Sequence, residues 1–192
     1  MRFLCLLSSA IAAAALLPFA HAADAPADAA RAPFELSEAA RKAYAQTMQE
    51  ARDLLLRKQF DAAIAKLDQL IAERPREPQA RFLKGIALTD QKKTDAALAV
   101  YRGLVADFPE MPEPHNNLAV LYAQKGELGL ARDELMLAIE TAPDYAVARE
   151  NLGDVYAQLA AEQYERATSL DKRNKSAPAK LKLVREAAAA AP

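Results

Sequence analysis

The sequence predicts an all-α protein built as a stack of antiparallel helix pairs, and three observations support this fold class. Alanine is abundant, glycine is scarce with 5 residues in 192, and β-branched residues are few, a composition that favours helix over sheet. Pro75, Pro109 and Pro143 stand 34 residues apart. Between these prolines, apolar residues recur at the spacing of amphipathic helices, with two helices in each unit.

Residues 1–22 are predicted to be a secretory signal peptide rather than part of the fold. Arg2 precedes an apolar run over residues 3–17, Pro18 breaks the run, and residues 20–22 (Ala-His-Ala) form the small-residue pattern that signal peptidase cleaves. The run is about 15 residues long, short of the roughly 20 that cross a bilayer, which argues against a membrane anchor. We therefore expect an exported chain, periplasmic or alternatively secreted, with no membrane span after cleavage.

Cleavage would also remove Cys5, the single cysteine, so the mature chain is expected to fold without a disulfide. Residues 23–36 are small and interrupted by prolines, and they are predicted to form a flexible linker. The folded domain is expected over residues 37–190, with its first helix capped by Ser37.

The 34-residue period divides the folded domain into a first copy (44–77), a second copy (78–111) and a third copy (112–145). In each copy a short polar turn is expected between the two helices, and the proline ends the second helix. One such pair cannot bury its apolar face alone, so the copies are expected to stack. Two columns keep their character from copy to copy, one small (Ala51, Gly85, Ala119, Gly153) and one large (Leu54, Leu88, Tyr122, Tyr156). We expect Gly85 and Gly153 to lie where two helices cross closely.

A fourth copy begins at Ala146 but lacks the turn and the closing proline. Its apolar residues step by three and four across the place where the turn is due, which predicts one continuous helix over residues 146–172. After a polar break, a final helix over residues 177–190 is expected to cap the stack with Leu181, Val184 and Ala188.

The period, the small and large columns and the closing proline resemble the tetratricopeptide repeat (TPR) family. The resemblance implies a right-handed superhelical stack, a TPR solenoid, whose concave groove binds a peptide or protein. The shortened fourth copy is similar to that of small exported proteobacterial proteins of this family. The family's opening tryptophan is replaced in the four copies, by Thr47, Arg81, His115 and Arg149.

The groove positions of the family, carried over column by column, fall on the first helix of each copy. They are Gln49, Arg52, Gln79, Phe82, Ile86, Asp90, Glu113, Asn116, Asn117, Val120, Gln124, Glu150, Asn151, Asp154 and Gln158. We interpret Asn117 and Asn151 as exposed amides that hold a peptide backbone, with the alternative that they only bridge neighbouring helices. Glu113, Glu150 and Asp154 would repel the C-terminal carboxylate that some family members bind.

The remaining features exclude several functions. With 25 basic and 26 acidic residues, the chain lacks the excess positive charge that is typical of a general nucleic-acid binder. No reactive set of side chains, metal site or cofactor motif is apparent, so the protein is predicted not to be an enzyme, and His115 is expected to serve packing. A basic stretch near the C-terminus is interpreted as a solvated cap or as a contact for lipid, glycan or protein (Lys172, Arg173, Lys175, Lys180, Lys182, Arg185). The alternative function is a self-associating structural protein whose groove is filled by its own chain or a second copy.

Overall fold

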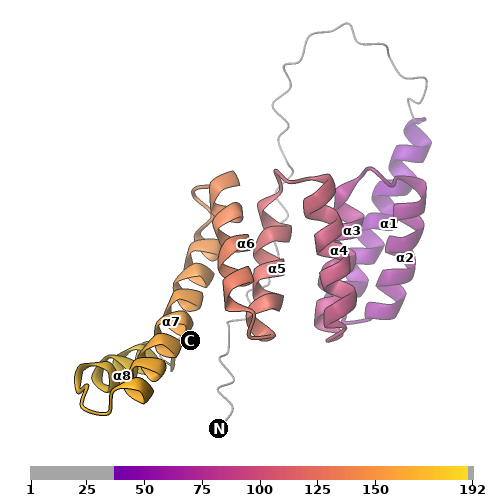
Figure 1. The fold of residues 1–192 in the computed structure, drawn as a ribbon. Coiled ribbons are helices and arrows are strands. Elements are labelled where there is room, and N and C mark those ends of the chain that lie inside the picture. The colour runs from indigo at the N-terminus through magenta and orange to yellow at the C-terminus, as the bar shows by residue number, and fades with distance from the viewer. Residues whose placement is uncertain (1–36, 190–192) are drawn as a thin grey trace, which may run out of the picture. The chain divides into compact units, whose positions relative to one another are not determined.

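The computed structural model describes residues 37–189 of the chain. The predicted signal peptide and linker lie outside the described residues. Within residues 37–189 the chain forms eight α-helices and no strand, which confirms the predicted fold class (Figure 1). The helices are α1 (Glu38–Leu56), α2 (Phe60–Glu73), α3 (Pro78–Asp90), α4 (Thr94–Asp107), α5 (Pro112–Gln124), α6 (Leu128–Thr141), α7 (Ala146–Leu170) and α8 (Ser176–Ala189).

The sequence explains where these helices begin and end. The Ser37 hydroxyl accepts a hydrogen bond from the Ala40 backbone N–H and so caps α1, as predicted. Both α3 and α5 begin with a proline, whose missing N–H costs nothing in the first turn. The second helices α2, α4 and α6 end at Glu73, Asp107 and Thr141, each two residues before a proline of the 34-residue series.

The turn between the two helices of each copy uses a left-handed backbone. The residue in this conformation is Lys58 (φ 57°) in the first copy, Lys92 (φ 61°) in the second and Gly126 (φ 78°) in the third. These positions are 34 residues apart, so the geometry of the turn repeats with the sequence. A left-handed residue commonly ends a helix, and glycine adopts this conformation at the lowest cost.

The described residues form two compact units that divide between Val100 and Tyr101, inside α4. In the N-terminal unit (described residues 37–100), α2 packs against both α1 and α3. The core of this unit combines large apolar side chains with small ones that let the helices approach (Met48, Ala51, Leu67, Leu70, Ala80). Ion pairs flank the core, with the Lys66 ammonium 2.6 Å from the Glu50 carboxylate and the Lys84 ammonium 2.6 Å from Asp68.

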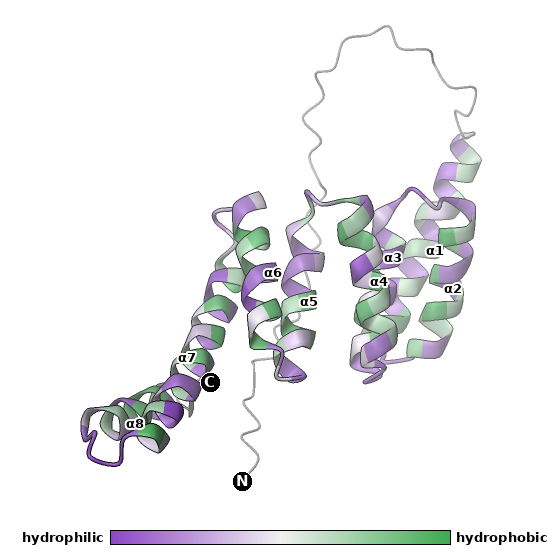
Figure 2. Ribbon diagram, in the orientation of Figure 1, coloured by the Kyte–Doolittle hydropathy of each residue, from purple (hydrophilic) through white to green (hydrophobic). Residues whose placement is uncertain are grey.

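In the C-terminal unit (described residues 101–189), α5, α6 and α7 each pack against the helix that follows, and α5 also contacts α7. The helix α5 is its most enclosed element, because every residue from Pro114 to Ala123 is buried. Apolar and polar stretches alternate along α5 (Figure 2), so its burial encloses polar side chains as well. Their hydrogen bonds therefore decide how this unit is held together.

The helix α7 runs without a break from Ala146 to Leu170, where the sequence predicted a single helix in place of a helical pair. The prediction that Gly153 lies at a close helix crossing is wrong: Gly153 is exposed, and a Cβ added there would meet no atom within 4 Å. Tyr156, which belongs to the large column of the same copy, is 49% exposed. The small column is buried in the other three copies, at Ala51, Gly85 and Ala119, whereas the fourth copy has no second helix of the pair.

Candidate functional site

The predicted groove residues of the N-terminal unit lie on α1 and α3, the first helices of the first and second copies. An Arg52 guanidinium N–H of α1 donates to the side-chain oxygen of Gln79 of α3 across 3.5 Å. Gln49 is exposed and donates to Asp53 on its own helix at 3.0 Å. Phe82 and Ile86 are half-buried and Asp90 is exposed. The structure therefore brings Arg52 and Gln79 together across two copies, while Gln49 bonds within α1.

Four side chains of the C-terminal unit form a chain of hydrogen bonds, here called the amide chain. The Asn151 amide N–H of α7 donates to Asn116 Oδ1 of α5 at 2.8 Å, and Asn116 Nδ2 lies 3.3 Å from Asn117 Oδ1. Asn117 Nδ2 then donates to the Tyr101 hydroxyl of α4 at 3.1 Å. The amide chain thus links α7, α5 and the end of α4.

The expectation that Asn117 and Asn151 stand exposed on the inner face is wrong, because each is only 4% exposed and Asn116 is fully buried. Their amides bond to neighbouring helices, which is the alternative interpretation of these residues. Buried amides need such partners, since an unpaired buried amide would cost about 1–3 kcal/mol.

Three other side chains near the same helices carry buried polar atoms without a hydrogen-bond partner: Glu113 (Oε2), Tyr145 (Oη) and Gln158 (Nε2). Burial, followed by the Glu113 charge, raises the pKa of Tyr145 to about 12. Burial and the Glu150 charge raise the pKa of Asp154. Glu113, Asp154 and Gln158 are half-buried, whereas Glu150 and Gln124 are exposed. Among the predicted groove residues of the C-terminal unit, these five side chains are therefore the ones that are at least partly exposed.

Sequence reasoning missed Tyr101 and Tyr145. Tyr145 precedes α7 at the position that Glu77 occupies before α3 and Met111 before α5, in the 34-residue register. Of the three residues in this column, Glu77, Met111 and Tyr145, only Tyr145 is aromatic, and the Glu113 charge lies within electrostatic range of it. An aromatic residue at this position is the signal that could have identified Tyr145. Tyr101 is fully buried, and its hydroxyl accepts from the buried Asn117 amide, a match between two polar groups that sequence reasoning could have sought.

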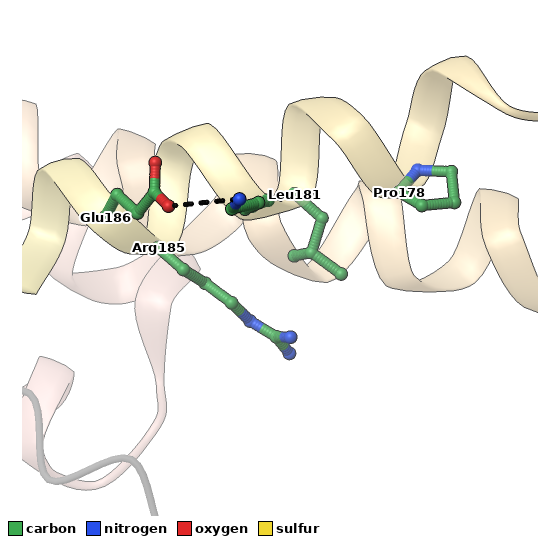
Figure 3. A pocket seen from close by; sticks show the side chains of 5 residues that line it. Pro178, Leu181, Arg185 and Glu186 are labelled. Carbon is green, nitrogen blue, oxygen red and sulfur yellow. Dashed lines mark ion pairs between the residues drawn. The ribbon is translucent and has the colours of Figure 1, made fainter.

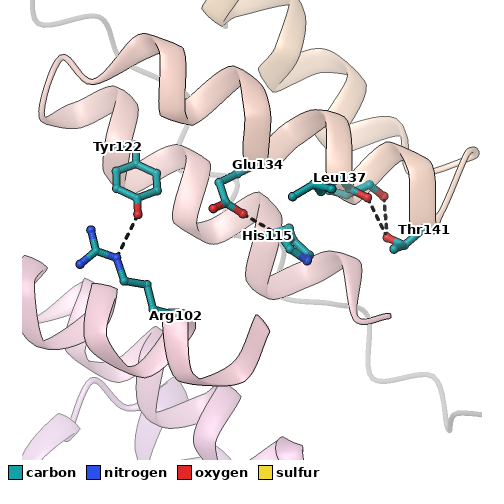
Figure 4. Close-up of polar contacts among 7 residues, drawn as sticks. Arg102, His115, Tyr122, Glu134, Leu137 and Thr141 are labelled. Carbon is teal, nitrogen blue, oxygen red and sulfur yellow. Dashed lines mark hydrogen bonds and ion pairs between the residues drawn. The ribbon is translucent and has the colours of Figure 1, made fainter. Parts of the chain in front are cut away.

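Polar residues occupy the four positions of the family's tryptophan. For three of them the structure shows a hydrogen-bond or ion-pair partner. His115 Nδ1 lies 2.7 Å from the Glu134 carboxylate of α6, and the imidazole is 7% exposed (Figure 4). Arg149 Nε donates to the Pro143 carbonyl at 2.8 Å, and the Thr47 hydroxyl donates to the Ala43 carbonyl at 3.1 Å. His115 is therefore buried, as the packing interpretation predicted, and its pairing with Glu134 was not predicted. Figure 4 also shows Arg102 donating to the Tyr122 hydroxyl, at 3.0 Å.

The basic stretch near the C-terminus is largely engaged with its own surroundings. Lys182 pairs with Glu186 at 3.7 Å beside a shallow hollow lined by Pro178 and Leu181 (Figure 3). Arg185 pairs with Glu165 of α7. Arg173 lies 3.7 Å from Asp171, and the Lys180 ammonium sits 5.8 Å from the centre of the Tyr164 ring. These contacts favour the interpretation of α8 as a solvated cap.

Two further kinds of site are absent from residues 37–189. No cluster of three histidine, cysteine or acidic side chains there is placed to hold a metal ion. None of the described helices is both long enough and apolar enough to cross a membrane.

Paired helices with a 34-residue period define a helical-repeat protein. Family models described as tetratricopeptide repeat match residues 48–112 and residues 88–150, and together they cover more than half of the chain. The chain therefore belongs to the tetratricopeptide-repeat family. Comparison with curated proteins found no match.

Similar solved structures share this fold. The first TPR domain of Spaghetti, bound to an HSP90 peptide, matches with a TM-score of 0.57 at 16% identity, over 61% of this chain and 93% of that one. The Yersinia enterocolitica chaperone SycD with a peptide of the translocator YopD matches with a TM-score of 0.58 at 17% identity, over 63% and 98%. MamA matches with a TM-score of 0.57 at 21% identity, over 76% and 82%. At these identities the similarity establishes the fold.

Proposed function

We propose that this protein is a non-catalytic adaptor that binds a peptide or protein partner on the inner face of its helical repeats. The main support is the surface where α5 and α7 meet. There Asn151 and Asn116 bond the two helices together, and nearby buried polar atoms of Glu113, Tyr145 and Gln158 have no hydrogen-bond partner. Gln124 of α5 and Glu150 of α7 are exposed, and a peptide supplies N–H and C=O groups along its length to which such side chains can bond.

Two of the similar structures add support, because each contains a bound peptide on the same fold. The family is one of interaction scaffolds rather than enzymes. We further propose that the protein acts in the periplasm, in cell-envelope assembly or maintenance. This part of the proposal is supported by the predicted signal peptide and by the resemblance to small exported proteobacterial proteins of the family.

Site-specific photo-crosslinking in the exporting cell tests the proposal. A photoreactive amino acid replaces Gln124 or Glu150, which are exposed on α5 and α7, or the exposed Asp133 of α6 as the control. We expect an adduct with a discrete partner from Gln124 or Glu150 and none from Asp133. Equal adducts from all positions, or adducts from Asp133 alone, would show that the inner face does not hold the partner.

Self-association is the second candidate, and exposed apolar side chains favour it. Leu130, Met136 and Leu137 of α6 are 48%, 51% and 44% exposed, and Tyr156 of α7 is 49% exposed. Where such side chains form a contiguous patch, they commonly mark a protein interface. Light scattering over a range of concentrations tests this candidate. A dimer that Leu137→Lys converts to a monomer would support it, and a monomer at every concentration would exclude it.

A further inference from the structure

One side of the first half of α7 is apolar and uncovered, and it is here called the open face. Its residues recur at intervals of three and four, which places them on one side of the helix (Gly153, Tyr156, Ala157, Ala160). Gly153 and Tyr156 are exposed, and the two alanines are half-buried. Asn151 and Val155, only 4% and 1% exposed, each stand two residues from Gly153, on nearly the opposite side of the helix at about 100° per residue. The open face is therefore turned away from the side by which α7 packs in its own unit.

In the other copies the equivalent residues are covered. Three members of the small column and two of the large column are buried (Ala51, Gly85, Ala119, Leu88, Tyr122). In the first copy, Ala51 belongs to one core with Leu67 and Leu70 of α2. Where the second helix of a pair is present, it thus takes part in covering this position.

The three second helices share a pattern on their buried sides. Each has an alanine, a large residue four positions later and an apolar residue three positions further, and all of these are at most 1% exposed (Ala63, Leu67, Leu70; Ala97, Tyr101, Leu104; Ala131, Leu135, Ala138). The positions 34 residues beyond the last set hold Glu165, Ser169 and Lys172, which are polar and exposed. The fourth copy therefore provides no helix of this kind.

The helix α8 packs against α7 further along and leaves the open face uncovered. Arg185 of α8 pairs with Glu165, and the Lys180 ammonium lies 5.8 Å from the centre of the Tyr164 ring. With α8 in place, Tyr156 is still 49% exposed.

Packing within the described chain does not require a glycine at position 153. A Cβ built there would meet no neighbouring atom of residues 37–189 within 4 Å. Glycine inside a helix costs stability relative to alanine, and one of its uses is to let another backbone approach closely. Gly153 thus suits a helix from outside the described chain that crosses α7 at this point.

We propose that the open face binds one amphipathic helix of a partner protein, in the place of the second helix that the fourth copy lacks. The three internal pairs define its chemistry: a small residue, a large apolar residue four positions later and an apolar residue three positions further. Gly153 admits the small residue, and the Tyr156 ring packs beside it. A second copy is a poorer occupant, because α2, α4 and α6 already bury their residues of this pattern. This surface is separate from the inner face of the proposed function.

Nuclear magnetic resonance titration of the isotope-labelled full-length protein with a helical peptide tests the proposal. The probe has the sequence of α2, residues 60–73, and a hydrocarbon link between positions 65 and 69, which are exposed in α2, holds it helical. We expect saturable shifts of the Gly153 and Tyr156 amide signals. A control peptide with Leu67→Glu should bind about ten-fold more weakly or worse, because Leu67 is the large residue of the pattern.

Matched variants of the protein show whether binding is local. Gly153→Leu fills the crossing and Tyr156→Lys removes the apolar contact, and each should weaken binding by about ten-fold or more. Gly129→Leu is the first control, because Gly129 is also an exposed helical glycine with free space around it. Leu183→Lys, at an exposed residue of α8, is the second, and affinity should stay within about two-fold in both. Leucine favours helix over glycine, so thermal melts should show Gly153→Leu at least as stable as the wild type.

The outcomes separate this inference from its rivals. The absence of saturable shifts, shifts at α1 instead of α7, or equal affinity of Gly153→Leu and Gly129→Leu would overturn the partner helix. A homodimer that Tyr156→Lys dissolves would assign the open face to a second copy and would overturn it too. Failure of the crosslinks from Gln124 and Glu150 would instead overturn the inner face and leave the open face standing.

Discussion

Lys58 and Lys92 hold a left-handed backbone that glycine adopts at the equivalent position 126. For a residue with a Cβ this conformation costs about 1–2 kcal/mol, partly offset by the freedom that glycine brings to the unfolded chain. We expect Lys92→Gly to stabilise the protein by about 0.5–1 kcal/mol in denaturant unfolding. Lys93→Gly, in the same turn but without a positive φ, is the control and should give no gain. Equal effects at both positions would contradict the strain at Lys92.

Gly126 provides the reverse experiment. A Cβ at this position would meet no atom within 4 Å, so Gly126→Ala adds backbone strain without a steric clash. We expect a loss of about 1 kcal/mol in the free energy of unfolding. If Gly126→Ala unfolds at the same denaturant concentration as the wild type, the turn tolerates any residue and the gain expected for Lys92→Gly disappears too.

The amide chain makes Asn151 a structural residue. Asn151→Ala would leave buried Asn116 Oδ1 without its 2.8 Å donor. We expect a loss of about 1–3 kcal/mol, well above the roughly 0.5 kcal/mol of a surface change. Gln124→Ala, on an exposed part of α5, is the control. A melting temperature unchanged by Asn151→Ala would show that the amide bond adds nothing to stability.

Asp154 should make stability depend on pH in a defined direction. Burial and the Glu150 charge raise its pKa in the folded protein above the ordinary value, so folding disfavours the charged form. The resulting destabilisation is present above the folded pKa and vanishes below the unfolded pKa. We therefore expect Asp154→Asn to raise the melting temperature at pH 7 and to have no effect at pH 3. A larger gain at pH 3 than at pH 7 would reverse the sign and contradict this environment.

At the scale of helices, Gly153 and Gly85 occupy the same column but different surroundings. Gly153 is exposed inside α7, so Gly153→Ala should stabilise the helix by about 0.5–1 kcal/mol. Gly85 is buried in α3, where Gly85→Leu should overpack the core and cost about 1–3 kcal/mol. Thermal melts of the two variants should therefore shift in opposite directions. A loss of stability in Gly153→Ala would mean that α7 is covered at this point.

The helix ends were predictable because each depends on a local signal. The serine cap of α1, the polar turns and the prolines after α2, α4 and α6 act on the backbone beside them. The exposure of Gly153 was not predictable from its column, since the column indicates only which kind of residue is usually packed at that position. The missing second helix of the fourth copy removes that neighbour, and only the assembled unit shows the consequence.

The candidate site was predictable in position but only partly in chemistry. Column matching located the residues on α5 and α7 and identified the acidic ones. It assigned Asn117 and Asn151, 34 residues apart, to the same groove column, whereas the hydrogen bond joins Asn116 to Asn151, 35 residues apart. The contact between α5 and α7 joins side chains that are offset by one residue from the 34-residue register, and the sequence period contains no information about this offset. Burial of the amides follows from the contact and could not be predicted either.

At the scale of the whole chain, the predicted signal peptide yields the last prediction. In an exporting bacterial cell we expect cleavage between Ala22 and Ala23, because the small residues at 20 and 22 fit signal peptidase. Mass spectrometry of the periplasmic product should show a chain that begins at Ala23. Since Cys5 is the single cysteine, the product should also lack any thiol that a maleimide can label, while the uncleaved chain carries one.

Ala22→Asp places a charged side chain at the cleavage site and should leave the labelled precursor attached to the membrane. Leu137→Lys, which alters an exposed residue of α6, is the control and should be processed like the wild type. An unprocessed product that keeps its thiol, or a chain that stays in the cytoplasm, would exclude a periplasmic adaptor while leaving the peptide-binding face to be tested by itself.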